Sequence, residues 1–310
     1  MFVDKLIEKI KEKKNPTVAG LDPKLEYVPE FVMKKFLQKS EPVLKAASEA
    51  IYEFNTVIID SIYDLVPAVK LQLAYYEMYG HYGMECFMNT IRYAKEKGLI
   101  VIADGKRNDI GSTVEAYSSA YLGEVSVDKI KSPVFDADAL TVNPYLGFDG
   151  IKPFLDDCKN YGKGIFILVK TSNKSSNQLQ DIKTQDGKLI YELVAEYVKE
   201  WGSSITGKYG YSSIGAVVGA TYPKEAQALR KIMNNSYFLV PGYGAQGGTA
   251  KDAAANFNSD GLGAIVNASR SIMCAYKSEK WKNLYDEHSF ASAARAEVID
   301  MRDKLRDALN

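Results

Sequence analysis

Short apolar runs alternate with longer helical patterns along almost the whole chain, and this alternation limits the possible folds more than any other feature. Strands separated by helices pair in parallel through right-handed crossovers, so the pattern predicts an α/β protein. The predicted strands are residues 17–21, 67–73, 99–103, 139–142, 164–169, 214–219, 237–240 and 262–266. The helical patterns between them include residues 43–63, 84–97, 113–122, 189–201, 224–233 and 249–256.

Repeated strand–helix units with no break in composition favour a single (β/α)8 TIM barrel that spans residues 1–310 as one domain. A doubly wound open sheet shows the same alternation and remains the alternative from the pattern alone. With 46% hydrophobic and 25% charged residues, the chain can bury a large core. Its first residues predict an amphipathic helix with Phe2, Leu6, Ile7 and Ile10 on one face.

Charge and composition exclude several classes of protein. The 39 basic and 39 acidic residues cancel, which argues against a nucleic-acid-binding protein with a strongly basic surface. The only cysteines, Cys86, Cys158 and Cys274, are far apart and suggest a reducing compartment without a disulfide framework. Two histidines, His81 and His288, make a histidine-rich metal site improbable. No apolar run approaches the ~20 residues that span a bilayer, and no signal peptide is recognisable, so we expect a cytoplasmic protein.

Polar residues follow the predicted strands at the positions where a barrel places its active site. They are Asp22, Lys70, Gln72, Asp104, Lys106, Asn143, residues 170–173, Thr221, residues 242–244, Ser269 and Arg270. In a barrel the carboxyl ends of all strands converge on one mouth. Strands also end in polar residues simply because loops contact water, but charges within apolar strands are harder to explain in this way. The polar stretch 172–187 predicts a long loop at the same mouth, mobile or lid-like.

The segment 100–117 carries the clearest chemical pattern. Asp104 and Lys106 are two residues apart in an extended run, so their side chains project from the same face. Lys70 would approach Asp104 from the neighbouring strand, and Asp109 follows on the next loop. Alternating charges offset the cost of desolvation and keep Lys106 protonated, ready to donate to a carbanion. An ordinary buried ion-pair network is the alternative interpretation of the same residues.

The glycine-rich stretch 241–248 predicts a phosphate site. Glycines let backbone N–H groups approach an anion, and a helix expected to start near Thr249 favours negative charge. Arg270, after the last strand, can bind phosphate with two hydrogen bonds, and Gln246 lies within the loop. Loops after the seventh and eighth strands form the usual phosphate site of such barrels. A glycine-rich turn alone is more often only a tight connection.

These motifs together resemble the orotidine 5′-phosphate decarboxylase family. The family pattern D-x-K-x-x-D-I followed by G-x-T is present as Asp104, Lys106, Asp109, Ile110, Gly111 and Thr113. Further similar segments are GLDP (20–23), VKLQ (69–72), VKTSN (169–173), PGYGAQGG (241–248) and NASRSI (267–272). The chain length and the segment 54–60 resemble the longer subgroup of the family. Two departures are Gly105, expected to face the outer helices, and Asn108.

The resemblance implies conversion of orotidine monophosphate to uridine monophosphate and carbon dioxide in de novo pyrimidine biosynthesis, without a metal or another cofactor. It implies that Lys106 donates a proton to C6 of the pyrimidine and that Asp104 lies near the substrate carboxylate. Lys70 would hold Asp104 and a ribose hydroxyl, and Asp109 completes the implied catalytic set. The implied substrate-binding residues are Asp22, Gln72, Ile110, Thr113, Thr171, Ser172, Pro241, Gln246 and Arg270.

Several of these residues have assigned parts of the substrate or the partner. Asp22 is similar to a ribose-binding aspartate, although a turn residue before proline is its alternative interpretation. Thr171 and Ser172 resemble the segment that recognises the pyrimidine, through a hydroxyl and a backbone amide. Asp109, Ile110 and Thr113 correspond to positions contributed by the second subunit. The resemblance therefore implies a homodimer with active sites shared across the interface.

Three other functions are compatible with parts of the sequence. A phosphosugar decarboxylase or aldol-type synthase would need a magnesium ligand on the second strand, where this chain has Lys70 and Gln72. An aldolase would use Lys170 to form a Schiff base, which borohydride would trap. A non-catalytic nucleotide-binding barrel would tolerate loss of the lysine–aspartate series, which is instead complete. Nothing in the sequence supports a membrane or nucleic-acid partner.

Overall fold

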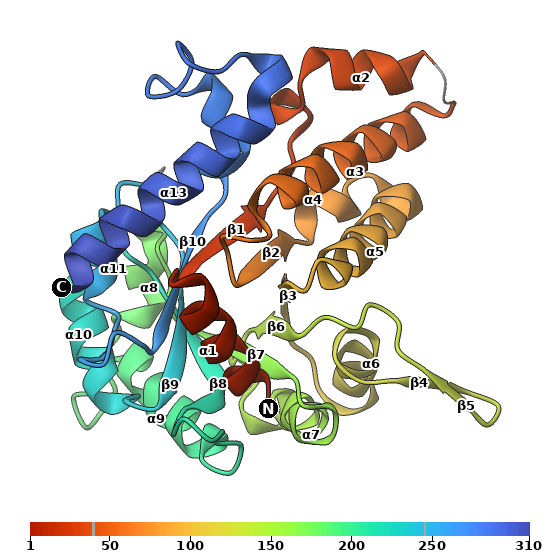
Figure 1. Cartoon of the computed structure of the whole chain (residues 1–310). Coiled ribbons are helices and arrows are strands. Elements are labelled where there is room, and N and C mark those ends of the chain that lie inside the picture. Colours follow the sequence, from red (N-terminus) through yellow and green to blue (C-terminus); the bar gives the residue numbers. More distant parts are fainter. Residues whose placement is uncertain (39–40, 245) are drawn as a thin grey trace.

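The computed structural model describes residues 1–38, 41–244 and 246–310, and its central element is a closed parallel barrel (Figure 1). Around the barrel the strand order is β1-β10-β9-β8-β7-β6-β3-β2. The strands are β1 Thr17–Leu21, β2 Ala68–Gln72, β3 Ile100–Arg107, β6 Ala139–Val142, β7 Gly164–Lys170, β8 Ser212–Val218, β9 Ser236–Val240 and β10 Ala264–Ala268. The predicted TIM barrel is confirmed, and the open sheet is wrong because β1 pairs with β10.

Strand ends differ from the predicted ones where the backbone departs from regular pairing. β3 continues to Arg107, four residues beyond the predicted end, with a register shift between Ala103 and Arg107. β10 starts at Ala264 rather than at residue 262, since Gly261 and Gly263 both have positive φ. Left-handed backbone of this kind is accessible to glycine and interrupts an extended run. Apolar pattern locates the strands, but glycine conformations and bulges set their ends.

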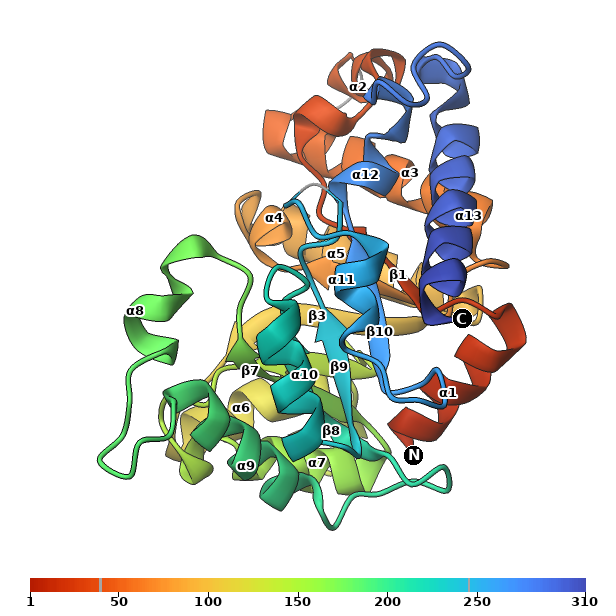
Figure 2. The same ribbon diagram turned by 90° about the vertical axis from the view of Figure 1, so that its left-hand side faces the viewer.

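Helices form the outer layer of the barrel, as Figure 2 shows from the side. They are α1 Phe2–Lys13, α2 Glu30–Leu37, α3 Val43–Ile62, α4 Ala74–Glu77, α5 Gly80–Glu96, α6 Gly111–Tyr121, α7 Lys152–Tyr161, α8 Asn177–Gln180, α9 Ile190–Gly202, α10 Pro223–Ile232, α11 Ala250–Ala254, α12 Arg270–Met273 and α13 Phe290–Leu309. None of the helices in the described part of the chain is long and apolar enough to cross a membrane.

Helix α1 covers the amino-terminal ends of the barrel strands. Its apolar face buries Phe2, Leu6, Ile7 and Ile10, as the periodicity predicts. Phe2 lies edge-on to Phe166 in β7, with ring centroids 6.0 Å apart. Burial of each such side chain stabilises the fold by about 1.5–3 kcal/mol. This end of the barrel is therefore filled, and the opposite end is left for a site.

A two-stranded hairpin extends from the barrel after α6 (Figure 1). It consists of β4 Val125–Val127 and β5 Ile130–Ser132, paired antiparallel, and all its residues are exposed. Asp128 at the turn has φ 51°. The sequence prediction did not include this hairpin, because runs of three residues carry too little alternation to be recognised.

Candidate active site

The carboxyl ends of the barrel strands surround a cavity of about 670 Å³, a volume typical of small-molecule sites. Ten of the predicted site residues line it: Asp22, Lys70, Gln72, Asp104, Lys106, Thr171, Ser172, Pro241, Gln246 and Arg270. Three others, Asp109, Ile110 and Thr113, are not among its lining residues in the described part of this chain. Most of the predicted residues thus meet at one mouth, although they come from six different strand ends or the loops after them.

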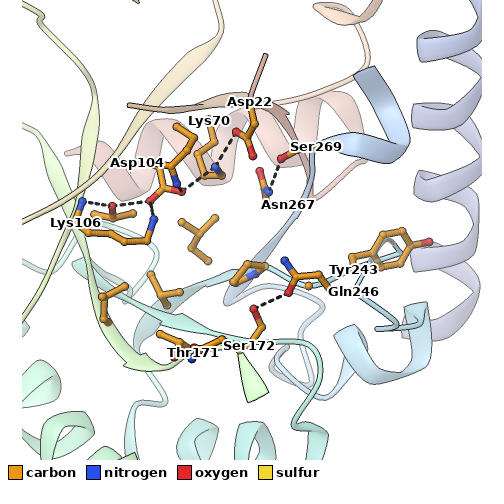
Figure 3. A pocket seen from close by; sticks show the side chains of 18 of the residues that line it. Asp22, Lys70, Asp104, Lys106, Thr171, Ser172, Tyr243, Gln246, Asn267 and Ser269 are labelled. Atoms are coloured by element: carbon orange, nitrogen blue, oxygen red, sulfur yellow. Dashed lines mark hydrogen bonds and ion pairs between the residues drawn. The ribbon is translucent and has the colours of Figure 1, made fainter. Parts of the chain in front are cut away.

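Four charged side chains form an alternating series along one wall of the cavity, in the order Asp22, Lys70, Asp104, Lys106; we call it the charge ladder (Figure 3). Lys70 Nζ lies 3.3 Å from Asp22 Oδ1 and 2.8 Å from Asp104 Oδ2. Lys106 Nζ lies 2.6 Å from Asp104 Oδ1. Parallel pairing explains the proximity, because Lys70 is in register with Gly20 on β1 and with Ile102 on β3. The predicted meeting of Lys70, Asp104 and Lys106 is therefore present.

Asp104 is the centre of the ladder and is almost fully buried. Besides the two lysines, it accepts hydrogen bonds from Gln72 Nε2 at 3.0 Å and from Thr141 Oγ1 at 2.8 Å. Four donors fix both carboxylate oxygens, so the side chain has one orientation. A buried carboxylate needs such partners, since a lone one would cost several kcal/mol.

The backbone of β3 is distorted at Lys106, which has φ 50°. A positive φ is uncommon outside glycine and stores strain, which is often found at functional sites. The Lys106 amide donates to Thr141 Oγ1 at 3.0 Å, so Thr141 fixes both this backbone and Asp104. Gly105 faces the outer layer as predicted, because a Cβ built on it would stand 3.5 Å from Leu73. The ammonium of Lys106 is thereby aimed at the cavity by a bulged strand rather than by simple alternation.

The ladder determines the ionisation of its buried members. Burial disfavours a charged Asp104, yet the ammonium groups of Lys70 and Lys106 hold the pKa of its carboxyl well below the usual range. Burial likewise opposes a charged Lys70, but Asp104 and Asp22 outweigh it and raise the pKa of Lys70. Both groups are therefore charged over the whole physiological range of pH.

This ionisation predicts how stability depends on pH. Because its folded pKa is lowered, the Asp104 carboxylate contributes its full stabilisation above the unfolded pKa of about 3.9 and loses it on further acidification. The raised pKa of Lys70 makes its contribution complete below about 10.4. We expect Asp104→Asn to lower the unfolding free energy by about 3 kcal/mol at every pH from about 5 to 9. Urea unfolding at several pH values measures this difference, and a deficit that varies strongly within the window would contradict the assignment.

The predicted phosphate end is built mainly from side chains. Ser172 Oγ donates to Gln246 Oε1 at 2.8 Å across the cavity mouth (Figure 3). Arg270 begins α12, is exposed and lines the same cavity as Gln246. A helix starts near Thr249 as expected, but its N-terminus is already capped. Thr249 and Asp252 form a reciprocal capping box, which places a carboxylate where an anion would bind.

Backbone amides of the glycine-rich loop are also engaged. Gly244 N donates to Gly248 O, Gly247 N to Gly244 O, and Gly248 N to Gly242 O, at 2.9–3.0 Å. Positive φ at Gly242, Gly244 and Gly247 produces this tight turn. Glycine here shapes the loop, and these three amides are not directed at an anion.

The segment after β7, predicted to recognise a pyrimidine, is bonded to a residue further along the chain. The Thr171 amide donates to Gln180 Oε1 at 3.0 Å, and Gln180 Nε2 donates to Thr171 Oγ1 at 2.8 Å. Lys170 is fully buried, pairs with Asp181 and does not line the cavity, so the Schiff-base role is not supported. Residues 172–187, predicted as a long loop, contain a 3₁₀ turn at Lys174–Ser176 and the short helix α8.

Asp109 lies on the rim, outside the cavity. Its Oδ1 accepts from the Ile110 amide at 2.8 Å, and Asn108 Nδ2 donates to Gly150 O at 3.3 Å. Ile110 is 56% exposed. Thr113 lies in the exposed first turn of α6. None of these three residues lines the cavity of its own chain.

Sequence reasoning missed several lining residues: Tyr27, Tyr75, Thr141, Leu168, Gln180, Val217 and Leu239. Asn173, Tyr243 and Ser269, which were expected at the mouth, and Asn267, which belongs to the 267–272 motif, also line the cavity. Thr141 has the most direct role, through its bonds to Asp104 and Lys106. The sequence signal for Thr141 was a single hydroxyl-bearing residue near the end of an apolar strand. Among the described residues, no group of three or more histidine, cysteine or acidic side chains is arranged to hold a metal ion.

Comparison with known proteins decides the family. Residues 47–283 match the family model described as orotidine 5′-phosphate decarboxylase / HUMPS family. The chain belongs to this family. A family relative from Caldicellulosiruptor saccharolyticus, named orotidine 5′-phosphate decarboxylase, is 46% identical over 299 residues, which cover 96% of this chain and 98% of the relative. One of the same name from Clostridium acetobutylicum is 43% identical over 310 residues, with 100% of each chain covered.

Solved structures of the orotidine 5′-phosphate decarboxylase family share the fold. The Leishmania donovani OMP decarboxylase superimposes with a TM-score of 0.69 at 28% identity, covering 97% of this chain and 98% of that one. The Plasmodium berghei orotidine 5′-monophosphate decarboxylase gives a TM-score of 0.75 at 21% identity, covering 99% and 100%. The second likeness concerns the fold alone.

Proposed function

We propose that this chain is a cofactor-independent decarboxylase that converts orotidine 5′-monophosphate to uridine 5′-monophosphate and carbon dioxide, a step of pyrimidine biosynthesis. The observation that carries the proposal is the charge ladder on the wall of a closed-barrel cavity. Family membership gives the reaction, and the ladder supplies the groups that the reaction needs.

The chemistry follows from the position of Lys106. Loss of carbon dioxide breaks the bond between C6 and the carboxylate carbon and leaves the electron pair on C6. No adjacent group of the pyrimidine accepts this pair, so the protein must stabilise it electrostatically. In our proposal the Lys106 ammonium stabilises the carbanion and donates a proton to C6, and water then reprotonates the amine. Asp104, 2.6 Å from Lys106 Nζ, holds this ammonium and lies near the departing carboxylate.

Binding of the rest of the substrate is assigned by position along the cavity. Asp22, Lys70 and Gln72 are proposed to contact the ribose, since they lie on the first two strands beside Asp104. The phosphate is assigned to the opposite side, and the pyrimidine to the end of β7. The residues are Pro241, Gln246 and Arg270 for phosphate, and Thr171 and Ser172 for the pyrimidine. Phosphate contacts would supply binding energy that orders the loops over the ring.

A direct assay tests the function and its independence of metals. Orotidine monophosphate loss, followed by ultraviolet absorbance, should proceed at an unchanged rate after exhaustive chelation, because the charge ladder supplies the stabilisation without a metal ligand on β2. Added magnesium should change the rate less than about twofold. Complete loss of turnover in chelator, restored by magnesium, would instead assign the chain to a phosphosugar-type reaction.

We further propose that the enzyme is a homodimer whose active sites are shared. Asp109 and Ile110 lie on the rim but outside their own cavity, next to the segment around Gly150. The same rim exposes large apolar side chains: Met78, Ile110, Tyr145, Leu146 and Phe148 are 46–76% exposed. These segments are in contact with one another. Arg107 pairs with Glu77, next to Met78, and a Cβ built on Gly150 would stand 3.0 Å from the backbone oxygen of Asp109. Large exposed apolar side chains on neighbouring segments are typical of a protein interface.

Three finer assignments belong to the same proposal. Residues 1–310 are taken as one domain, supported by relatives that match nearly end to end. Membership of the longer subgroup is supported by the segment 54–60. A cytoplasmic location is supported by the three cysteines, all free in the structure.

A further inference from the structure

At the end of β7, on the side away from the cavity, lies an ion pair that the proposed chemistry does not use. Lys170 is fully buried, and its ammonium pairs with the Asp181 carboxylate, whose side chain is 40% exposed. The ammonium also lies 4.7 Å from the ring centroid of Tyr222 and 5.1 Å from that of Tyr191. A lysine is rarely buried completely, because desolvation of the charge is costly. Its partners here come from α9, from the start of α10 and from the segment after β7.

A bulge in β7 explains why Lys170 points away from the cavity. Leu168 is paired with Val217 and lines the cavity, whereas Lys170 is paired with Val218 after a register shift. Regular alternation would place Leu168 and Lys170 on the same face of the strand. The bulge instead re-aims Lys170 into the helical layer. The next residue, Thr171, then returns to the cavity wall.

Gln180 and Asp181 connect the segment after β7 to the end of that strand through hydrogen bonds and an ion pair. Gln180 bonds the amide and the hydroxyl of Thr171, at 3.0 and 2.8 Å. Asp181, the next residue, pairs with Lys170. Tyr222 adds a third point, because its hydroxyl donates to Asn173 O at 3.3 Å. Residues 171–181 therefore form a loop closed at its base, and Thr171, Asn173 and Gln180 on it line the cavity.

We propose that Lys170 is a positioning residue: its ion pair with Asp181 holds residues 171–181 in the conformation that presents Thr171, Asn173 and Gln180 to the substrate. The inference rests on the proposed function and assigns a role to a residue outside the cavity. If only a fraction of molecules holds this conformation, the apparent affinity for substrate is the intrinsic affinity multiplied by that fraction, and bound substrate restores the conformation. The pair thus acts on substrate binding rather than on the decarboxylation step.

The substitution Lys170→Met tests this, because it keeps the apolar stem and removes the charge, while the half-exposed Asp181 remains in contact with water. We expect the KM for orotidine monophosphate to rise about tenfold and kcat to change less than about twofold. Asp181→Asn should shift KM in the same direction and serves if Lys170→Met does not fold. Lys188→Met is the matched control: Lys188 pairs with Glu196 at 2.7 Å near the same segment but does not line the cavity. It should leave both constants unchanged.

Hydrogen–deuterium exchange on the free protein provides a readout that needs no substrate. The Thr171 amide should exchange at least about tenfold faster in Lys170→Met, while amides in β2 and β3 keep their protection. Unchanged KM and unchanged exchange would overturn the proposal, as would a fall in kcat alone, which indicates general damage to the fold. If the unmodified enzyme lacks turnover of orotidine monophosphate, the proposed function fails, and the exchange result still decides the role of Lys170.

Discussion

Lys106→Ala should lower kcat for orotidine monophosphate by a factor of about 10⁴ or more. General acid catalysis contributes about 10²–10⁴, and electrostatic stabilisation of a developing charge contributes about a further 10²–10³. Both depend on one ammonium, which lies 2.6 Å from Asp104 on a strained section of β3. No other lysine lining the described part of the cavity is free for this task, because Lys70 is already placed between Asp22 and Asp104.

Binding of the product separates loss of chemistry from loss of the site. Uridine monophosphate lacks the carboxylate, so its affinity for Lys106→Ala, measured by calorimetry, should stay within a few-fold of the unmodified value. Arg270→Ala provides the contrast, because its proposed partner is charged throughout the reaction and its loss should mainly raise KM. Near-normal turnover by Lys106→Ala would show that the proton reaches C6 from another group.

The sequence predicted the barrel and the centre of the site because both depend on periodicities of a few residues. Apolar runs separated by helical patterns located all eight strands of the barrel. The i, i+2 spacing predicted that Asp104 and Lys106 would lie together, as they do. Parallel pairing then brought Lys70 to Asp104 without any further information. What pattern could not supply was the bulge at the end of β3 and the positive φ at Lys106. These depend on the packing of neighbouring strands.

Loops explain most of the misses at the site. Gln180 lies on a segment with no periodicity, so its bonds to Thr171 could not be anticipated. The closed start of α11 was misjudged because Asp252 supplies its own carboxylate to Thr249. Thr141 was overlooked because a threonine in a strand is ordinary by propensity. Thr141 and Gln180 bond to residues that are not their neighbours in sequence, and at Thr249 a local capping bond replaces the predicted contact with an anion.

Asp109, which does not line the cavity of its own chain, is expected to serve the active site of the partner subunit. Lys106→Ala and Asp109→Ala should each be nearly inactive alone. In a hybrid dimer with a shared site, one site carries both defects, and the other receives intact Lys106 and intact Asp109. Random mixing makes about half of the dimers hybrid, each with one restored site of two, so about a quarter of the unmodified activity should return.

A self-contained site gives the opposite result from the same mixture. If Asp109 served its own cavity, every site of a hybrid would carry one defect, and nothing would be regained. The measurement is activity after co-expression of equal amounts of the two variants, with hybrids isolated through different affinity tags. Mixing Lys106→Ala with Asp104→Asn is the matched control, because both residues line the same cavity of one chain and no combination restores a site. Recovery only in the first mixture would establish that the rim carrying Asp109 and the exposed Ile110 completes the partner's site, and absence of recovery in verified hybrids would rule it out.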